Sequence, residues 1–319
     1  ADAAGPGAML VRMMERAGYD RAYAAALTAS TAIIGPIIPP SIIMIIYALQ
    51  DDTVTPLGLF MAGIVPGVAI AAAMMVTNQV ICLRRGYRSD VPRPNLREMI
   101  VNSVKAIPAL LLPVIILGGM RGGMFTPTEA SVVAVVYALL VGKYVYRTLQ
   151  WKMVPVLLSR TAILTSSVLI IVAASNAFAW VLTTENVPQA ISEWIVHLGL
   201  GPIALLLLVN VFLLVFGIFI EPLPGVMVLV PILAPVAHAA GIDPIHFAMV
   251  VIYNLTLGMI TPPVGGLLFV TSAVTRVPLP LLSRELGPFM LAHIVVLLLI
   301  TLVPSLSTWL PALSGLAVR

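Results

Sequence analysis

The chain has 319 residues, of which 60% are apolar and only 9% are charged, and its mean hydropathy is +1.08. A soluble domain of this length needs far more polar surface, so the composition excludes a large soluble helical domain. The net charge of +4 could indicate nucleic-acid binding, but the basic residues are distributed along the chain in a way that excludes that partner.

Long uncharged blocks predict membrane-spanning helices. Five blocks contain no Asp, Glu, Lys or Arg, and each exceeds the roughly 20 residues that a helix needs to cross the hydrocarbon core. The blocks are Ala22–Gln50, Thr53–Leu83, Thr161–Thr184, Pro244–Thr275 and Leu286–Val318. We therefore expect an all-α, polytopic protein embedded in a lipid bilayer.

The basic residues predict which side of the membrane each loop occupies. Of the 17 Lys and Arg residues, all but Arg121 and Arg319 fall into four groups between the apolar segments, at 12–21, 84–105, 143–160 and 276–284. Because loops on the cytoplasmic side are enriched in Lys and Arg, we expect all four groups there. The enrichment of cytoplasmic loops in Lys and Arg is therefore sufficient to explain the positive charge of the chain.

This sidedness gives a consistent path through the membrane. The expected spans are Ala22–Leu49, Leu57–Cys82, 104–120, Ala130–Arg147, Thr161–Thr183, Pro244–Ala273 and Leu291–Leu310. The segment Trp151–Arg160 mixes Trp, Lys and Arg with apolar residues, as helices in the membrane interface do. Ile195–Ala240 is interrupted at 221–225, and it forms either two full spans or a re-entrant hairpin.

Two segments match when the sequence is shifted by 223 positions. Ala17-Gly-Tyr-Asp20 is followed by Gly35-Pro-Ile-Ile-Pro-Pro40, and Ala240-Gly-Ile-Asp243 is followed by Gly258-Met-Ile-Thr-Pro-Pro263. In the expected topology the first copy runs outward and the second runs inward. The chain is therefore predicted to contain an inverted repeat, and transporters built in this way bind substrate and ions near the midplane, where corresponding helices are broken.

The Pro-Pro pairs explain why such breaks attract ligands. Two prolines remove two backbone donors and block continuation of the preceding helix. Carbonyls released at the break suit a hard cation such as sodium, and the helix that starts after the break suits an anion. One break alone is commonly a simple kink, whereas two in matching positions favour a site. The residues expected to bind the anionic substrate at these breaks are Pro40, Ser41, Thr261 and Pro262.

Three further polar residues lie among apolar runs. Glu221 is a functional candidate because an acidic group at membrane depth is costly, although it is an ordinary loop residue if its segment forms two full spans. Ser175 and Asn176 either line the substrate pathway or bond a neighbouring helix, which is the commoner role of such residues. The sequence contains neither HExxH nor GxSxG, so an intramembrane enzyme is unsupported.

A glycine-rich outer turn precedes the helix expected from Ala130. Either Thr126 or Thr128 is expected to cap this helix, with Pro127 in its first turn and Glu129 at its positive end. Arg121, just before this turn, is the one non-terminal basic residue expected outside, where an arginine is equally an ordinary surface residue or a contact for an anionic solute.

Several motifs together point to one family. They are Gly-Pro-Ile-Ile-Pro-Pro-Ser at 35–41, Gly-Gly-Met-Phe-Thr-Pro-Thr-Glu-Ala at 122–130, Phe-Gly-Ile-Phe-Ile-Glu-Pro-Leu-Pro at 216–224 with Pro-Ile-Leu-Ala-Pro at 231–235, and Gly-Met-Ile-Thr-Pro-Pro-Val-Gly at 258–265. With these motifs the chain resembles the large membrane subunit of tripartite ATP-independent periplasmic (TRAP) transporters of the C4-dicarboxylate type. They occur in the family's order and cover essentially the whole chain.

The resemblance implies a sodium-coupled importer of small organic acids that works by an elevator-type motion in the bacterial inner membrane. It also implies two partners, a small four-helix membrane subunit (separate or fused upstream) and a periplasmic substrate-binding protein. Sodium is the only cofactor implied. Its expected ligands, partly through backbone carbonyls, are Gly35, Ile38, Pro40, Glu221, Gly258 and Thr261.

The resemblance further implies re-entrant hairpins and divides the chain at 1–83, 84–105 and 106–319. These segments are the remainder of the first inverted repeat, a cytoplasmic basic connector and the second inverted repeat, with its hairpin at 195–240 and its broken helix at 244–273. The first arm of hairpin one is expected to precede Ala1, so we expect an N-terminally truncated chain. A stand-alone sodium/dicarboxylate symporter, which needs no binding protein, is the alternative function.

Overall fold

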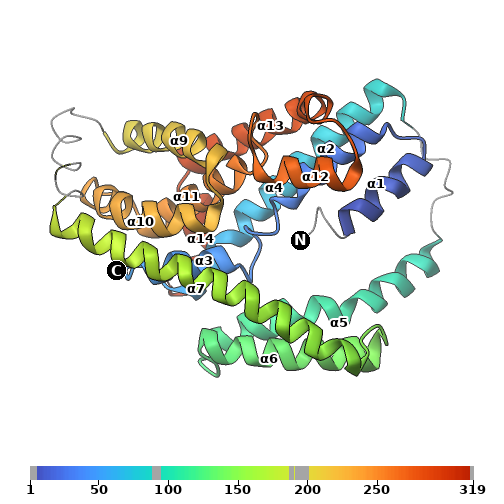
Figure 1. The fold of residues 1–319 in the computed structure, drawn as a ribbon, viewed down its shortest axis with the longest axis horizontal. Helices are drawn as coiled ribbons and strands as arrows, with labels where there is room; N and C mark the ends of the chain where they lie inside the picture. Colours follow the sequence, from blue (N-terminus) through green and yellow to red (C-terminus); the bar gives the residue numbers. More distant parts are fainter. Residues whose placement is uncertain (1–5, 88–94, 187–189, 191–200, 317–319) are drawn as a thin grey trace. The chain divides into compact units, whose positions relative to one another are not determined.

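The computed structural model describes residues 6–87, 95–186, 190 and 201–316 (Figure 1). Within these residues the chain folds into helices and contains no strand. Seven of the helices described are long and apolar enough to cross a membrane. The prediction of an all-α, polytopic membrane protein is therefore confirmed.

The chain forms two compact units, which are described separately. Unit 1 comprises Ala1–Val91 and Ser175–Arg319, and unit 2 comprises Pro92–Ala174. The helices within unit 1 are α1 (Pro6–Arg16), α2 (Arg21–Ala32), α3 (Ile42–Gln50), α4 (Pro56–Arg85), α9 (Pro202–Phe219), α10 (Pro222–Ala239), α11 (Pro244–Gly258), α12 (Gly266–Thr275), α13 (Leu279–Leu302) and α14 (Ser305–Leu313). Unit 2 contains α5 (Leu96–Arg121), α6 (Pro127–Leu140) with a π-helical turn, η1 (Val141–Val145), and the 3₁₀ turn η2 (Trp151–Met153), and α7 (Val154–Thr184) begins in it.

The predicted repeat is present as two matched series of helices. In the first, α2 stops, the chain crosses a break, and α3 and then α4 follow. In the second, α11, a break, α12 and α13 follow in the same order, and α13 starts 223 positions after α4. The sequence shift therefore corresponds to a repeated structure that extends well beyond the short matching motifs.

The turn that precedes each broken helix is built with the same hydrogen bonds. In the first copy, the N–H of Tyr19 donates to the carbonyl of Met14 over 3.1 Å, and the equivalent pair of the second copy is 3.0 Å apart. Gly18 and Gly241 take φ values of +87° and +75°, a left-handed conformation that glycine adopts without steric cost. We call these two segments, 13–20 and 236–243, the glycine–aspartate turns.

An aspartate then starts each broken helix. The carboxylate of Asp20 accepts from the N–H of Tyr23 at 3.0 Å, and that of Asp243 accepts from the N–H of His246 at 2.9 Å. A side-chain oxygen at this position satisfies one of the amide donors that a helix leaves unpaired at its start. The Gly and Asp residues that are in register in the sequence thus have the same structural roles in both copies, the left-handed turn residue and the helix cap.

Contacts between the two copies are reciprocal. Helix α1 contacts α12, and α10, which precedes the second broken helix as α1 precedes the first, contacts α3. Likewise α2 contacts α13, and α11 contacts α4. Figure 1 shows α9, α10 and α11 side by side, with α11 covered so that every side chain from Ile245 to Leu257 is buried. An exchange of partners of this kind is what an internal two-fold relation between the repeats produces.

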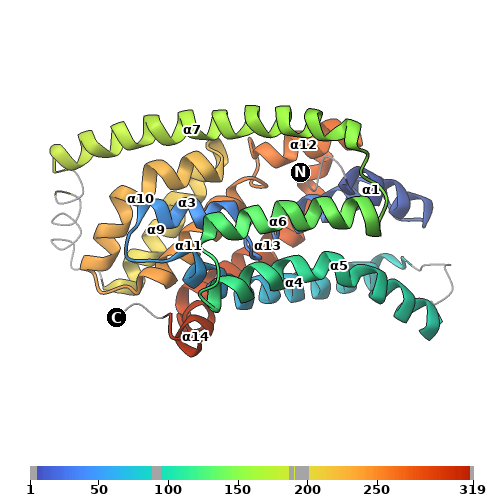
Figure 2. The same ribbon diagram turned by 90° about the horizontal axis from the view of Figure 1, so that it is seen from below.

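Unit 2 is built around the α5–α6 hairpin, whose helices run side by side in Figures 1 and 2. Thr126 caps α6, since its hydroxyl accepts from the N–H of Glu129 at 3.3 Å and the Glu129 carboxylate accepts from the N–H of Thr126 at 2.8 Å. Pro127 occupies the first helical position. The expected cap is confirmed with Thr126 as the capping residue, and Arg121 ends α5 just before this turn.

Two predicted boundaries are wrong. The interfacial helix at Trp151–Arg160 is not separate, because a proline near the start of α7 is compatible with its first turn and nothing then interrupts the helix up to Thr184. The last span begins at Leu279 and ends at Leu302, where Pro304 follows, so Leu291–Leu310 is misplaced at both ends. The basic segment 84–105 contains the end of α4 and the start of α5 at Leu96, and its place as a cytoplasmic connector stays a prediction. The repeat boundaries themselves stay a prediction.

Candidate functional site

The first break separates α2 from α3 and contains four of the predicted site residues. Helix α2 ends at Ala32, and the Pro39–Pro40 pair, joined by a cis peptide bond, precedes the start of α3. The Ser41 hydroxyl donates to the carbonyl of Pro36 at 2.5 Å and accepts from the N–H of Met44. Ser41 therefore fixes the path of the break and caps α3, as the helix start after the break requires.

Carbonyl groups in the first break are left without protein donors. Among the described residues, no hydrogen bond uses the carbonyl of Gly35 or Ile38, and both residues are exposed. Pro40 is exposed as well. Free carbonyl oxygens at a broken helix are suitable ligands for a hard cation, so the residues present at this break fit the ion that the sequence predicts.

The break packs against α4 through glycine. A Cβ atom on Gly67 would lie 2.8 Å from Cγ1 of Ile38, and Gly63 likewise faces the carbonyl of Ile37 at very close range. Larger residues at these two positions of α4 would push the break away from the helix. The two glycines of α4 thus allow the break, with its exposed carbonyls, to pack closely against this helix.

The second break has the same plan and a different hydrogen-bond pattern. Pro262 and Pro263 are also joined by a cis bond, and they lie between α11 and α12. The carbonyl of Gly258 accepts from the N–H of Thr261 at 3.0 Å, and the carbonyl of Thr261 accepts from the N–H of Gly265 at 3.1 Å. A cation at this break would share carbonyl oxygens that already accept one backbone bond, which is possible because each carbonyl oxygen has two lone pairs.

Thr261 is held in place at the end of α11. Its hydroxyl donates to the carbonyl of Leu257 at 2.9 Å, and its side chain is half-buried. Gly265 lets the loop fold back, because a Cβ there would lie 2.6 Å from the carbonyl oxygen of Met259. Pro262, next to Thr261, is exposed.

The tip of the α9–α10 hairpin meets the second break. A Cβ atom on Gly258 would lie 2.5 Å from the carbonyl oxygen of Gly217 and 2.6 Å from its Cα, so the two backbones touch. At the tip, an Oε1 oxygen of Glu221 lies 3.9 Å from the position of a Cβ built on Gly266, the first residue of α12. The structure thus brings together Glu221, Gly258 and Thr261, three residues that the sequence predicts for one site.

This contact bears on how the hairpin is built. Helix α11 has 15 residues and is roughly 22 Å long, which is less than the roughly 30 Å thickness of the hydrocarbon core. The end of α11, and the hairpin tip that packs on it, are therefore expected at membrane depth, which favours the re-entrant alternative. Helices α9 and α10 have 18 residues each and are long and apolar enough to cross a membrane, so both alternatives for this segment stay predictions.

Two other predicted residues cannot be placed in the site. Ser175 and Asn176 belong to α7, but their side chains lie outside the described part of the chain. Whether they line the pathway or contact a helix stays a prediction.

Sequence reasoning missed a buried amide network behind the second break. Asn254 in α11 donates to the side-chain oxygen of Asn210 in α9 at 2.7 Å, and Asn210 donates to the hydroxyl of Thr301 in α13 at 2.8 Å. His246 continues the network with a ring nitrogen 3.3 Å from the carbonyl of Thr301. The only signal in the sequence is an isolated amide within an apolar run, and such residues commonly bond helices together inside the membrane.

The missed glycines follow the same pattern. Gly217 and Gly265 have no distinctive sequence context beyond their place in the apolar motifs, yet each permits a backbone approach that no larger residue allows. Together, the two breaks present exposed carbonyls, helix starts after prolines and one carboxylate. That arrangement can hold a cation and a small anion but supplies no pair of groups for covalent catalysis.

Comparisons with known proteins give the family. The pattern of the tripartite ATP-independent periplasmic transporter, DctM component, matches residues 1–306. The chain is 41% identical over 317 residues to the C4-dicarboxylate TRAP transporter large permease protein DctM of Pseudomonas aeruginosa, covering 99% of this chain and 74% of that protein. The chain belongs to this family.

Other relatives share the architecture and differ in the solutes in their names. The sialic acid TRAP transporter large permease protein SiaM of Vibrio cholerae is 40% identical over 98% of this chain and 73% of its own length. The isethionate TRAP transporter permease protein DctMQ of Oleidesulfovibrio alaskensis is 35% identical over 94% of this chain and 47% of its own length. Members of the TRAP large permease family are membrane components of transporters and not enzymes, which excludes the intramembrane-enzyme alternative.

Proposed function

We propose that this TRAP large permease imports small organic acids across the bacterial inner membrane, coupled to sodium, by an elevator-type movement of its broken-helix core. Relatives named for C4-dicarboxylates, sialic acid and isethionate support an organic anion as substrate. The observation that carries the proposal is the paired breaks, with the tip of the second hairpin packed against the second break.

Each chemical group at the breaks has a part in this proposal. The carbonyls of Gly35 and Ile38, which no described donor uses, would bind one sodium ion. The second ion would be bound at Gly258 and Thr261, with Glu221 on the hairpin tip adding negative charge nearby. Pro40, Ser41 and the equivalent residues of the second copy would position the carboxylate of the substrate near the helix starts.

The proposal includes two protein partners. The family description names a tripartite transporter, so the chain acts as one of three components. We propose a small four-helix membrane subunit and a periplasmic substrate-binding protein as the other two. The combined designation DctMQ of the isethionate relative, of which the chain covers 47%, supports fusion of the small subunit as one arrangement in the family.

The test is uptake of a labelled C4-dicarboxylate into proteoliposomes that contain the full transporter. The four conditions combine the presence or absence of an inward sodium gradient with the presence or absence of the binding protein. The proposal expects uptake only when both are present. Uptake with sodium alone would favour the stand-alone symporter, and uptake driven by a proton gradient would overturn the assignment of sodium.

A charge-neutralising pair of variants connects the assay to the site. Glu221→Gln removes the carboxylate beside the second break, and we expect the sodium concentration for half-maximal uptake to rise about tenfold, which corresponds to roughly 1.4 kcal/mol of lost ion binding. Glu185→Gln changes an exposed residue that directly follows α7, and as the matched control it should leave the sodium concentration for half-maximal uptake unchanged. If the two variants change the sodium concentration for half-maximal uptake equally, Glu221 does not belong to the proposed site.

A further inference from the structure

One buried histidine in α13 contacts both broken helices. The Nε2 atom of His293 lies 3.2 Å from the backbone carbonyl oxygen of Ser30 in α2. Its Nδ1 atom lies 3.0 Å from the hydroxyl of Tyr253 in α11, and that hydroxyl also lies 3.1 Å from the carbonyl of His293. All three residues are fully buried. A single imidazole ring therefore connects the helix before the first break to the helix before the second.

The two partners of the ring occupy equivalent positions of the repeat. Ser30 and Tyr253 are 223 positions apart, which is the shift that relates the two copies. Ser30 precedes Gly35 by five residues, and Tyr253 precedes Gly258 by five residues. His293 thus contacts both broken helices at the same distance along the chain from the glycines that are proposed to bind sodium.

The hydrogen bonds assign the proton of the ring. A backbone carbonyl only accepts, so the contact with Ser30 requires the proton on Nε2. In the neutral ring Nδ1 then accepts from the hydroxyl of Tyr253. The carbonyl of Ser30 belongs to the last turn of α2, where a helix leaves its carbonyls without intrahelical donors, and His293 supplies the donor. The ring therefore holds the end of α2 just before the first break.

Packing alone does not require a histidine at this position. The repeat equivalent of His293 in α4 is Ile70, which is fully buried as well. An apolar residue therefore fills the corresponding place in the first copy. A buried imidazole needs partners for its nitrogens to offset the loss of water, whereas isoleucine needs none. The histidine is thus explained by its two bonding partners, which lie on the two broken helices.

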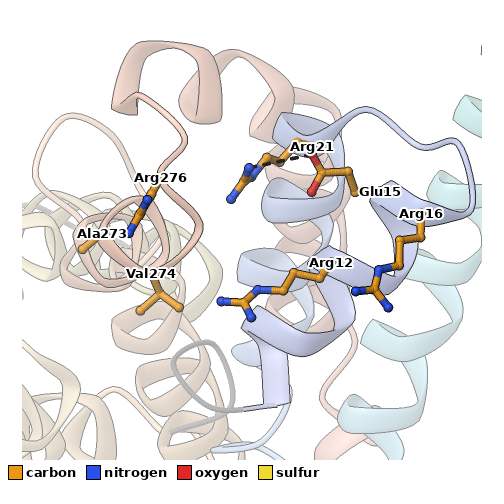
Figure 3. Close-up of a pocket in the computed structure, with 7 residues that line it drawn as sticks. All are labelled: Arg12, Glu15, Arg16, Arg21, Ala273, Val274 and Arg276. Atoms are coloured by element: carbon orange, nitrogen blue, oxygen red, sulfur yellow. Dashed lines mark ion pairs between the residues drawn. The ribbon is translucent and has the colours of Figure 1, made fainter.

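A different junction between the repeats has no such attraction. Where α1 and α2 approach α12, the guanidinium groups of Arg12, Arg21 and Arg276 are directed toward a common space (Figure 3). Glu15 is the one carboxylate among the residues that line this space, and it lies 3.7 Å from Arg21. Like charges repel, so these arginines do not draw the two copies together. The buried bonds of His293, in contrast, attach directly to both broken helices.

We infer that His293 is a positioning residue for ion binding, which holds both breaks in the arrangement that binds sodium. The inference rests on the proposed function and adds a coupling between its two ion sites. An ion at the first break orders the end of α2, and the ring transmits that order to α11, so the second ion meets a break that is already in place. Sodium therefore binds cooperatively, and loss of the ring weakens both sites together.

The experiment measures uptake of a labelled C4-dicarboxylate by the full transporter in proteoliposomes as the sodium concentration is varied. The unmodified protein should give a Hill coefficient for sodium that approaches the limit of about 2 set by two sites. His293→Leu should raise the sodium concentration for half-maximal uptake about five- to tenfold, because it removes the hydrogen bonds that stabilise the ion-binding arrangement. It should also lower the Hill coefficient toward about 1. Unfolding is titrated for every variant, so that a loss of stability is measured separately.

His246→Leu is the matched control. His246 is also a buried histidine with a partner near each ring nitrogen, but these partners, Ser307 and Thr301, lie in α14 and α13, and it makes no bond to α2. The control should lower stability as His293→Leu does and should leave the half-maximal sodium concentration and the Hill coefficient unchanged. If the two leucine variants change these sodium parameters equally, or if His293→Leu changes neither, the inference is wrong.

Milder variants test the same contact if leucine at position 293 prevents folding. Tyr253→Phe removes only the hydroxyl and should raise the half-maximal sodium concentration about two- to fivefold. Tyr137→Phe, which removes a hydroxyl bonded to the carbonyl of Pro108 in unit 2, should not change it. His293→Gln keeps an amide donor for the carbonyl of Ser30 and should stay within about threefold of the unmodified protein.

The outcomes separate this inference from the proposed function. Equal effects of the two phenylalanine variants, or a glutamine variant as impaired as the leucine variant, would overturn the role of His293 while sodium-dependent uptake by the unmodified transporter still supports the proposed function. Uptake by the unmodified transporter that does not depend on sodium would overturn the proposed function, and this inference with it.

Discussion

Replacing Gly258 with alanine adds one methyl group at the point where the hairpin tip meets the second break. The new Cβ would lie 2.5 Å from the carbonyl oxygen and 2.6 Å from the Cα of Gly217, whereas ordinary contacts between such atoms are about 3.5 Å or longer. The end of α9 would therefore have to move by about 1 Å. Both sides of the contact are backbone, so no side chain can rotate to make room.

The expected cost follows from overpacking. Extra methyl groups in a well-packed core cost about 1–3 kcal/mol, and a contact between two backbones places Gly258→Ala toward the upper end of that range. Since the displaced tip carries Glu221, we expect sodium-dependent uptake to fall at least tenfold as well. Stability is measured by titrating the solubilised protein with a denaturing detergent and following its unfolding, and uptake is measured in proteoliposomes.

Gly287→Ala is the matched control for this prediction. Gly287 also lies within a helix of unit 1, but a Cβ atom there would meet nothing within 4 Å. Alanine at that position should be neutral or stabilise the helix by about 0.5–1 kcal/mol, because glycine is a poor helix former. If Gly258→Ala and Gly287→Ala behave alike in both assays, the close approach of Gly217 and Gly258 does not hold the hairpin against the break.

Two other predictions concern contacts within unit 1. Asn210→Leu should lower the free energy of unfolding by about 1–3 kcal/mol, because it removes the side-chain oxygen to which the buried amide of Asn254 donates and leaves that amide only its bond to the backbone carbonyl of residue 210. Asn210→Leu/Asn254→Leu should recover part of that loss in the same unfolding titration, and additive losses would contradict the side-chain bond between them. Arg85 and Glu285 form an ion pair 2.7 Å long that is partly exposed. A double-mutant cycle should give a coupling energy of about 0.5–1 kcal/mol that decreases as salt is added. A coupling energy that does not change with salt would contradict this prediction.

Local chemistry explains which features were predictable from sequence. The breaks followed from the Pro-Pro pairs, since proline stops a helix wherever the rest of the chain lies. The same holds for the cap at Thr126 and for the Gly and Asp residues of the glycine–aspartate turns. The matching of two such series then predicted the repeat, because the spacing between the copies is constant at 223 positions.

The features that were missed depend on groups far apart in the chain. Nothing near Gly217 in the sequence indicates that its backbone touches Gly258, and the bond of Asn210 to Asn254 joins two different helices. The last span was misplaced because Arg284 and Glu285 read as a loop. In the structure both lie in α13, where Glu285 pairs with Arg85 at the end of α4. Charges within a helix are tolerated once a partner on another element is supplied.

The glycine–aspartate turns have a consequence for how the protein is assembled. Every hydrogen bond of each turn and its aspartate cap comes from a stretch of about a dozen residues, Met13–Ala24 in one copy and Val236–Phe247 in the other. Each turn can therefore form as soon as its own segment has been synthesised, and neither needs a contact with the other repeat. The contacts of α1 with α12 and of α10 with α3 join residues from opposite ends of the chain and must come later. The two glycine–aspartate turns can thus be folded already when the two repeats pack against each other in the membrane.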